Sequence, residues 1–323
     1  MSYKPKVLEV AAGGTGAATL TNHGVLLGQS TSAVTATAAG TSGQILQSGG
    51  ASANPAYTTS TYPATNSSND IIYGSGSNAY GNLTVGTVPG APLLFNGTAL
   101  QYYNPNFHMQ YVEDFFATNS GVTPWRKFNF NGGDFDSPVE PDSGHPGVVQ
   151  LETGTSTNGY CALGLQNVTT TTGSVILGGG AIDLYMVFKL SNLSDGTDTY
   201  QIAVGFGDST NTPPPFDNGV FLNYSSTVNS GNWQMSTASS STRTTSNSAT
   251  AATTNWTTVR INVNAGATLC TYYVNGVSLG TISTNIPTTT IGPFFVLSKS
   301  AGTANRFLKI DLVYMFQQLT SSR

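Results

Sequence analysis

The stretch TLCTYYVNGVSLGTI, residues 268–282, decides the fold. Apolar and polar side chains alternate on both sides of the dipeptide Asn275-Gly276, which is the pattern of two half-buried strands. A two-residue turn between such strands needs positive φ at both central residues, and Asn-Gly is among the pairs that adopt it most readily. The stretch therefore predicts a tight antiparallel hairpin.

The same period of two recurs through residues 105–323, with few residues that favour helices. Four stretches carry it most clearly. In each stretch, alternate side chains should lie on the same face of the strand, and for Val259, Ile261 and Val263 the opposite face carries Arg260 and Asn262. The four sets are Tyr200, Ile202, Val204 and Phe206; Val259, Ile261 and Val263; Ile182, Leu184, Met186, Phe188 and Leu190; and Leu308, Ile310, Leu312, Tyr314 and Phe316. Many short strands without helices predict an antiparallel β-sandwich.

Charge is scarce along the chain. Only 8% of its 323 residues are charged, against about 25% in an average soluble domain. The net charge is −4 and no basic run occurs, so we expect no nucleic-acid partner. No apolar run is long enough for a membrane span, and the start MSYKPKVLEV lacks the apolar region of a signal peptide. We therefore expect synthesis in a cytoplasm without a signal peptide, and no membrane insertion.

The composition changes near residues 101–109, where Asn104-Pro105 favours a turn. Residues 1–104 are rich in Gly, Ala, Ser and Thr, whereas residues 105–323 gain aromatic and alternating apolar residues. The sequence thus predicts an all-β chain of two parts, a stem over 1–104 and a sandwich head over 105–323.

The first part contains a degenerate repeat that begins at Gly24, Gly43 and Asp70. Each unit has an apolar pair, a Gly/Ser turn and a lone apolar or Tyr residue, which predicts a strand, a turn and a returning strand. The apolar pairs are Leu26 and Leu27, Ile45 and Leu46, and Ile72 and Tyr73. One unit buries too little apolar surface to offset the entropy of ordering its backbone, about 1–2 kcal/mol per residue. We expect these pairs to form the core of an intertwined homo-oligomeric stem; a disordered linker is the alternative.

Five later segments follow one another in a characteristic order. They are HPGVVQLETGTSTNGYCALGL (145–165), GGAIDLYMVFKLS (179–191), DNGVFLNY (217–224), NWTTVRINVNAGATLCTYYVNGVSLGTI (255–282) and RFLKIDLVYM (306–315). This order resembles that of concanavalin-A-like jelly-roll domains in phage tail and fibre proteins. The stretch GGTGAATLTNHGVLLGQSTSAVTATAAGTSGQILQSGG (13–50) is similar to the repeats of phage tail fibres.

The resemblance implies a virion appendage. The stem would form a trimer and attach through its N-terminus to other virion proteins of the tail or baseplate. The head would bind a host-surface glycan without catalysis, and several tethered heads would gain avidity. A glycan-degrading, tailspike-like enzyme and a purely structural spacer or capsid decoration remain alternatives.

Motifs for catalysis or metal binding are weak. The acidic stretch DFDSPVEPD, with Asp134, Asp136, Glu140 and Asp142, is broken by proline and is interpreted as a solvated loop. His23, His108 and His145 stand alone in the sequence, so zinc is not expected. Calcium could draw oxygens from Asp195, Asp198, Asp208 or Asp217, but turn residues are the preferred interpretation, and we expect no cofactor. Cys161 and Cys270 are interpreted as free buried thiols.

The loop GDSTNTPPPFDNG, residues 207–219, is the candidate glycan site. Pro213, Pro214 and Pro215 would stiffen it and present Phe216 to a sugar ring, while the nearby polar groups would bind hydroxyls. Those groups are Asp208, Asp217 and Asn218, with Arg243 from the polar hairpin expected over residues 236–254. The alternative is a corner in which Phe216 plugs the edge of the sandwich. Trp233 and Trp256 are expected to pack inward.

Overall fold

The structure, a computed structural model, describes residues 8–9, 14–84, 93–95, 100–102, 106–115, 125–136, 139, 142–165, 173–209 and 216–322. It divides into two compact units, Met1–Asn104 and Pro105–Arg323. Over the described residues, strands account for the regular structure apart from one short 3₁₀ turn, η2 (Asn229–Gly231), so the predicted all-β class is confirmed. None of the described segments forms an apolar helix of membrane-spanning length.

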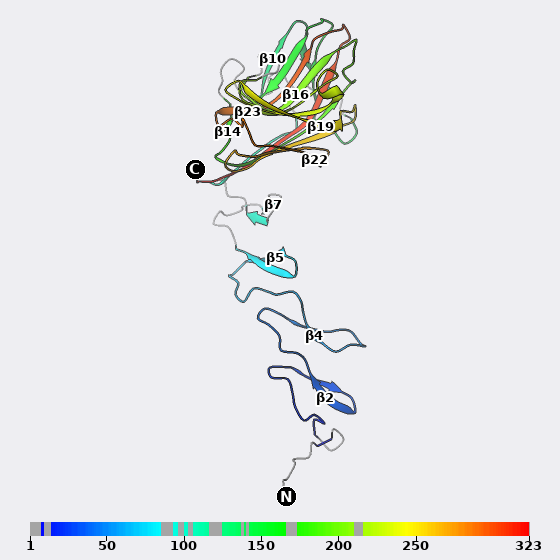
Figure 1. Ribbon diagram of the computed structural model, residues 1–323, viewed down its shortest axis with the longest axis vertical. Helices are drawn as coiled ribbons and strands as arrows, with labels where there is room; N and C mark the ends of the chain where they lie inside the picture. The colour runs from blue at the N-terminus through cyan, green and yellow to red at the C-terminus, as the bar shows by residue number, and fades with distance from the viewer. Residues whose placement is uncertain are drawn as a thin grey trace. The chain divides into compact units, whose positions relative to one another are not determined.

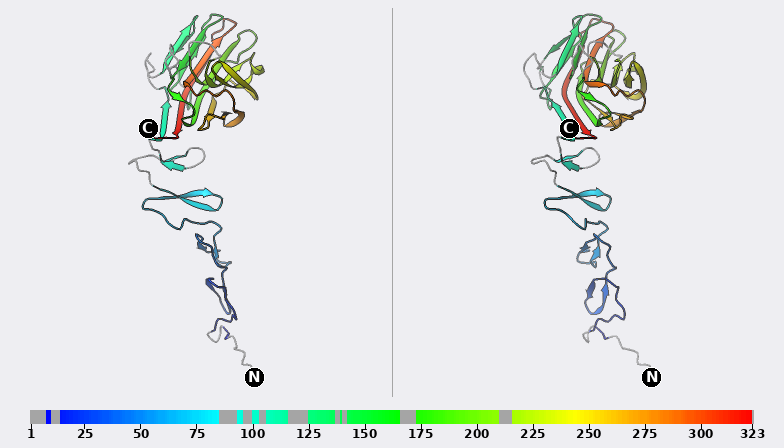
Figure 2. Two further views of the ribbon diagram at one scale, coloured as in Figure 1. Left: turned by 60° about the vertical axis from the view of Figure 1, so that its left-hand side comes forward. Right: turned by 90° about the vertical axis from the view of Figure 1, so that its left-hand side faces the viewer.

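The first unit consists of two-stranded hairpins, each of which Figure 2 shows as a separate ribbon. Their strands are β1 (Leu26–Gln29) with β2 (Ser32–Ala36), β3 (Leu46–Gln47) with β4 (Ala56–Tyr57), β5 (Ile71–Gly76) with β6 (Ala79–Leu83), and β7 (Leu93–Phe95) with β8 (Leu100–Tyr102). The predicted strand, turn and return of each repeat is therefore present.

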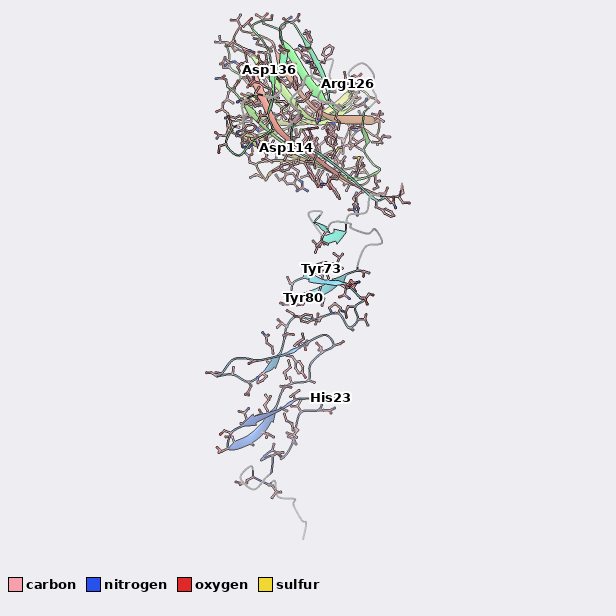
Figure 3. All side chains as sticks on the ribbon, turned by 180° about the vertical axis from the view of Figure 1, so that it is seen from behind. His23, Tyr73, Tyr80, Asp114, Arg126 and Asp136 are labelled. Carbon is pink, nitrogen blue, oxygen red and sulfur yellow. The ribbon has the colours of Figure 1, made fainter. Side chains whose placement is uncertain are left out.

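Apolar side chains of this unit are left in solvent. Among the side chains that the structure describes within residues 1–104, no apolar one is buried. Leu26 is 51% exposed, and Ile45 and Ile72 are each 48% exposed. Tyr62, in the segment between β4 and β5, stacks on Tyr80 of β6 with ring centroids 4.5 Å apart (Tyr80 is labelled in Figure 3). A single copy of the unit thus lacks a hydrophobic core.

The second unit is an antiparallel β-sandwich of two sheets, which form the two layers of strands in Figure 1. The first sheet has the order β10 (Arg126–Phe130), β13 (Tyr160–Gly164), β23 (Thr290–Lys299), β16 (Tyr200–Gly207), β17 (Gly219–Ser225), β18 (Asn232–Ser239) and β19 (Thr242–Ala251), with β14 (Val175–Ile176) beside β23. The second sheet has the order β11 (Asp134–Asp136), β12 (Val149–Glu152), β24 (Phe307–Leu319), β15 (Gly180–Leu190), β20 (Thr257–Val263), β21 (Cys270–Val274) and β22 (Val277–Ile282), with β9 (His108–Glu113) beside β24.

The core lies between the two sheets and is built from the predicted alternation. On β15, every second residue from Ile182 to Leu190 is buried, and the predicted inward sets on β16 and β20 are buried as well. Trp233 packs inward as predicted. Cys161 and Cys270 are free and fully buried, as predicted, and burial raises the pKa of each thiol to about 12.

Both predicted hairpins are present. Asn275 and Gly276 join β21 to β22 with φ values of 50° and 77°, as a two-residue turn requires. The polar stretch over residues 236–254 forms the second half of β18 and all of β19, and Ser240 and Ser241 make their turn with φ values of 48° and 66°.

The alternation predicted for β24 is wrong beyond Ile310. Asp311 is an extra residue in this strand, because Val187 of β15 pairs with Leu312 while Phe188 pairs with Ile310. Such a β-bulge reverses the facing of all later residues. Leu308 and Ile310 therefore face the core as expected, but Val313 and Met315 replace the expected Leu312, Tyr314 and Phe316 in it.

Candidate functional site

The outer face of the second sheet carries the candidate site. Since successive side chains of a strand point to opposite faces, the residues between the core positions of β15, β20 and β21 project outward. They include Tyr185, Arg260 and Tyr273, each of which is half-buried. Tyr185 pairs directly with Arg260, and Arg260 pairs with Tyr273, so the three side chains form one row across three strands.

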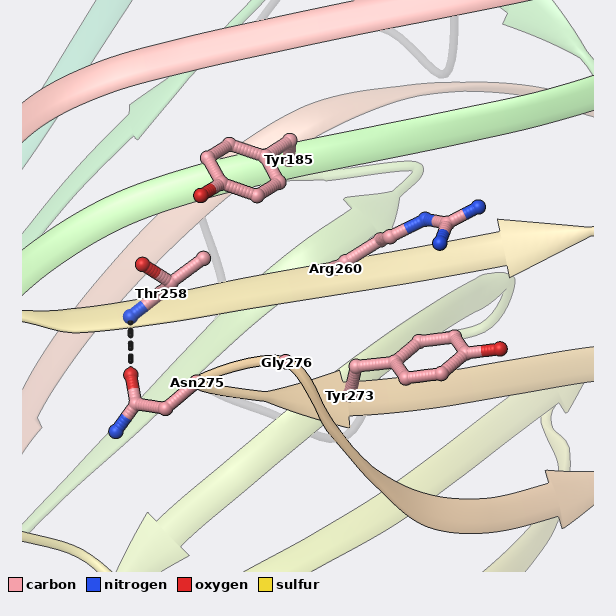
Figure 4. Close-up of a pocket in the computed structure, with 6 residues that line it drawn as sticks. All are labelled: Tyr185, Thr258, Arg260, Tyr273, Asn275 and Gly276. Atoms are coloured by element: carbon pink, nitrogen blue, oxygen red, sulfur yellow. Dashed lines mark hydrogen bonds between the residues drawn. The ribbon is translucent and has the colours of Figure 1, made fainter. Parts of the chain in front are cut away.

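A hollow of about 500 Å³ lies over this row. Figure 4 shows its lining residues, which come from β15, β20, β21 and the turn after β21. They are Tyr185, Thr258, Arg260, Tyr273, Asn275 and Gly276. The hollow thus combines two aromatic rings with hydroxyl, amide and guanidinium groups.

The charge of Arg260 is balanced within the sheet. Its Nε donates a hydrogen bond of 2.6 Å to Oδ1 of Asp183, and this bond raises the pKa of the guanidinium. The guanidinium carbon also lies 5.1 Å from the ring centroid of Tyr273, within cation–π distance. The bond to Asp183 uses only Nε, and the two terminal nitrogens carry four further N–H donors. The pair can therefore bind hydroxyl or carbonyl oxygens while staying neutral overall.

The turn fixes an amide at the edge of the hollow. Oδ1 of Asn275 accepts a hydrogen bond of 2.9 Å from the backbone N–H of Thr258, drawn as the dashed line in Figure 4. This bond orients the side chain and leaves its NH₂ group as a donor. The positive φ values of the turn bring this amide beside β20.

The bulge at Asp311 extends the row to β24. Tyr314 pairs with Tyr185, and because the bulge has reversed its facing, its ring lies on the outer face of the sheet. Asp311 is 7% exposed, and its Oδ2 lies 2.7 Å from Nδ1 of His145. His145 stands alone in the sequence, but the fold pairs it with this buried carboxylate.

Trp256 directly precedes β20, and the expectation that it packs inward is wrong. It is half-buried on the outer face, where its Nε1 donates to Oδ2 of Asp142 over 3.0 Å. Its ring stacks on that of His145 with centroids 3.9 Å apart. Asp142 also accepts a 2.7 Å bond from Lys189, so the turn that contains Asp142 and His145 is held against the sheet.

The sequence of this sandwich matches a known family. A family model described as SO2946-like, C-terminal domain, matches residues 144–311, more than half of the chain. The chain belongs to the SO2946-like C-terminal domain family. No curated protein matches the sequence.

Solved structures similar to this family member include the Emp47p carbohydrate recognition domain. The likeness covers 72% of this chain and 100% of that chain, with 12% identity and a TM-score of 0.45. Peanut lectin with a 9mer peptide is similar over 66% of this chain and 99% of that chain, with 14% identity and a TM-score of 0.41. A sialidase is similar over 65% of this chain and 18% of that chain, with 10% identity and a TM-score of 0.43.

Phe216, the predicted stacking residue, is 2% exposed and cannot present its ring to a sugar. It packs in a small cluster on the outer face of the first sheet, 4.4 Å from Phe294 and 5.0 Å from Phe221 between centroids. Two glycines leave room for these rings. A Cβ on Gly207 would lie about 3 Å or less from Phe294, and a Cβ on Gly219 would lie about as close to Phe221. This burial argues against a ligand contact at Phe216; the ring is packed, as in the alternative of a plug, but on the outer face of the first sheet and not at the edge of the sandwich. Pro213, Pro214 and Pro215 lie outside the described residues.

The other residues of the predicted site gather beside this plug. Asn218 donates from Nδ2 to Oδ2 of Asp208 over 2.9 Å and accepts from the backbone N–H of Ser240. Asp217 accepts a 2.6 Å bond from the hydroxyl of Ser241. Asp208 is 5% exposed, and its burial raises its pKa. These bonds tie the loop before β17 to the turn between β18 and β19.

Arg243 covers the same plug. Its guanidinium carbon lies 5.3 Å from the ring centroid of Phe221, and its buried Nη2 has no hydrogen-bond partner. Burial lowers the pKa of this guanidinium. Arg243 therefore lies over Phe221, whereas Asp217 and Asn218 are bonded to Asp208 and to the turn at Ser240 and Ser241.

The remaining acidic candidates have structural partners. Asp195 and Asp198 both pair with Arg306, with N–O distances of 3.5 and 3.0 Å. Asp134 and Asp136 belong to β11, so the interpretation of their stretch as a loop is wrong there; Glu140 lies outside the described residues. Within the described part of the chain, no group of three or more His, Cys, Asp or Glu side chains is placed to hold a metal ion.

Sequence reasoning missed the hollow because it looked for ligand contacts in loops. The available signal was the identity of the outward residues in the alternating strands. A solvated sheet face is usually small and polar, whereas Tyr185, Arg260 and Tyr273 are large and able to stack.

Proposed function

We propose that the chain is a glycan-binding subunit of a virion appendage such as a tail fibre. Residues 105–323 bind a host-surface glycan without catalysis in the hollow on the second sheet. Residues 1–104 form a homo-oligomeric stem, a trimer, and attach the subunit to other virion proteins. The observation that carries the binding function is the row formed by Tyr185, Arg260 and Tyr273.

The chemistry of this row suits a sugar. Aromatic faces bury the C–H surfaces of a pyranose ring, and a few fixed polar groups bind its hydroxyls. Arg260 supplies donors in a rigid fork, and Thr258 and Asn275 add a hydroxyl and an amide. Because Asp183 balances the charge of Arg260, the surface favours a neutral glycan over a polyanion.

The lining also favours binding over hydrolysis. Glycosidases use two carboxyl groups that flank the cleaved bond. None of the six described lining residues carries a carboxyl group. The side chains present can hold and orient a sugar, which is the chemistry of an adhesin.

The stem proposal rests on the exposed apolar side chains of the first unit. Leu26, Ile45, Leu46 and Ile72 are each between 38% and 51% exposed in a single copy. Burying them would stabilise the hairpins by about 25 cal/mol per Å² of apolar surface. Further copies of the same chain offer complementary surface, and closed cyclic symmetry allows three to assemble.

The binding function is tested on the full chain with arrays of neutral and acidic oligosaccharides and bacterial surface polysaccharides, followed by calorimetric titration. We expect neutral glycans to bind, and Tyr185→Ala and Tyr273→Ala each to weaken the affinity about three- to tenfold. Phe130→Ala removes an exposed ring from the first sheet and should leave the affinity unchanged. Binding that survives both tyrosine variants, or preferred binding of proline-rich peptides, would contradict the proposal. New reducing ends after incubation would instead indicate an enzyme.

A further inference from the structure

The row of outward side chains extends beyond the hollow, and with Tyr314 added we call it the tyrosine row. Tyr314 of β24 pairs with Tyr185, which pairs with Arg260, which pairs with Tyr273. Directly opposed residues in a sheet share a face, so these four side chains project on the same side from four neighbouring strands. The hollow itself is lined only by the last three of them.

The spacing of the row is set by the sheet. Neighbouring strands lie about 4.8 Å apart, so Tyr185 and Tyr273 are about 10 Å apart and Tyr314 extends the row to about 14 Å. This strand spacing is comparable to the length of one sugar ring along an extended glycan chain. A chain that crosses the strands can therefore place one sugar over each of the four side chains.

Tyr314 is suited to the same role as the tyrosines of the hollow. It is half-buried, and its burial together with the nearby charge of Asp183 raises the pKa of its hydroxyl, so the phenol stays neutral and able to donate. Asp183 thus bonds to Arg260 and also acts through its charge on Tyr314. Beyond Tyr314, the paired residue on β9 is Val112, which is 54% exposed and adds apolar surface at the end of the row.

The twist of the sheet limits the form of the ligand. Adjacent strands rotate by about 20–25°, so the row turns by about 60–75° over three strand steps. A single glycan chain can follow this rotation by turning about its linkages. The flat surface of a crystalline polysaccharide cannot contact all four side chains at once.

We infer that this face binds an internal stretch of a single, extended, neutral glycan chain of about four sugars, with rings stacked on Tyr314, Tyr185 and Tyr273 and with Arg260 bonded between them. The inference rests on the proposed function and adds to it the class of ligand. A site for a terminal sugar would need only the hollow, whereas this row engages a longer chain. Binding should then strengthen with chain length until the row is filled.

The test uses the full chain and β-1,4-linked oligomers of glucose and of N-acetylglucosamine, from one to six sugars, measured by calorimetry. We expect the affinity for at least one series to rise up to about four sugars and then level off. Tyr314→Ala should weaken the four- and six-sugar complexes about three- to tenfold and leave the two-sugar complex unchanged. Tyr185→Ala should weaken every length. Tyr314→Phe, which keeps the ring, should retain most of the affinity for long oligomers.

The outcomes separate the inference from the proposed function. If Tyr185→Ala weakens binding but affinity does not depend on length and Tyr314→Ala has no effect, the hollow binds a terminal sugar and the inference is wrong. The same conclusion follows if neither oligomer series binds while branched or terminal sugars on the array do. If no variant of the row changes any glycan affinity, the proposed site itself is wrong. Tight binding to insoluble crystalline cellulose or chitin would also contradict the inference.

Discussion

Nδ1 of His145 lies 2.7 Å from Oδ2 of Asp311, and the two residues are 166 positions apart in the chain. Asp311 is the extra residue of the bulge in β24 and is 7% exposed. Its other carboxylate oxygen, Oδ1, is buried without a hydrogen-bond partner. His145 therefore stabilises the residue whose insertion brings Tyr314 to the outer face of the second sheet.

Replacing His145 by Ala should destabilise the sandwich. The change leaves a buried carboxylate without this partner and removes the ring that stacks on Trp256, so we expect a loss of about 2–3 kcal/mol in urea unfolding. His23→Asn, a change at an exposed histidine of the first unit whose positive φ Asn tolerates, is the control. Equal stability of the His145→Ala variant and the unmodified chain would show that the pair does not hold the bulge.

Phe216 should matter for stability and not for binding. Its ring fills the space over Gly207 between Phe294 and Phe221, so Phe216→Ala should cost about 3–4 kcal/mol in unfolding free energy. Calorimetric affinity for the glycan should stay unchanged under conditions where the variant is folded. A folded Phe216→Ala protein that loses glycan binding would restore the loop as the binding site.

The carboxyl pair formed by Asp136 and Glu152 should make the free energy of unfolding depend on pH. A hydrogen bond with Glu152, together with partial burial and the charges of Glu152 and Asp134, raises the pKa of Asp136 above its ordinary 3.8. The folded chain thus binds this proton more tightly than the unfolded chain. The resulting stability is present below pH 3.8 and is lost as the pH rises through the raised value.

Asp136→Asn, which keeps a neutral partner for Glu152, should therefore gain stability relative to the unmodified chain as the pH rises through that window. Urea unfolding at a series of pH values measures this difference. The single variant Glu152→Gln should reduce the same pH dependence, because burial and the charge of Asp134 remain. A difference between Asp136→Asn and the unmodified chain that stays constant with pH would rule out the shared proton.

Assembly of the stem into an oligomer should depend on its exposed apolar pairs. Ile45→Asp with Leu46→Asp places charges where further copies would pack, so native mass spectrometry of the full chain should detect dissociation of the oligomer. Ser48→Asp, a change at an exposed polar residue of the same hairpin region, should leave the assembly intact. An unchanged oligomer in the double variant would contradict the shared core.

The sequence predicted the sandwich because strand alternation and the Asn275-Gly276 turn are local properties. It failed at β24, where the bulge at Asp311 depends on pairing with β15 and on a histidine distant in the sequence. It also placed the candidate site in a loop, since a Phe beside prolines looks exposed until its packing partner Phe294 is known. The row of Tyr185, Arg260 and Tyr273 follows from strand register, which no single stretch of the sequence contains.

The central claim is that the outer face of the second sheet binds the glycan. Its most direct test is an experimental structure of the full chain with the oligosaccharide that binds most tightly in the titrations. We predict sugar rings over Tyr185 and Tyr273, with hydrogen bonds from Arg260 to their hydroxyls. A sugar bound instead beside Arg243 and Asn218 on the first sheet, with the tyrosine row empty, would contradict the account.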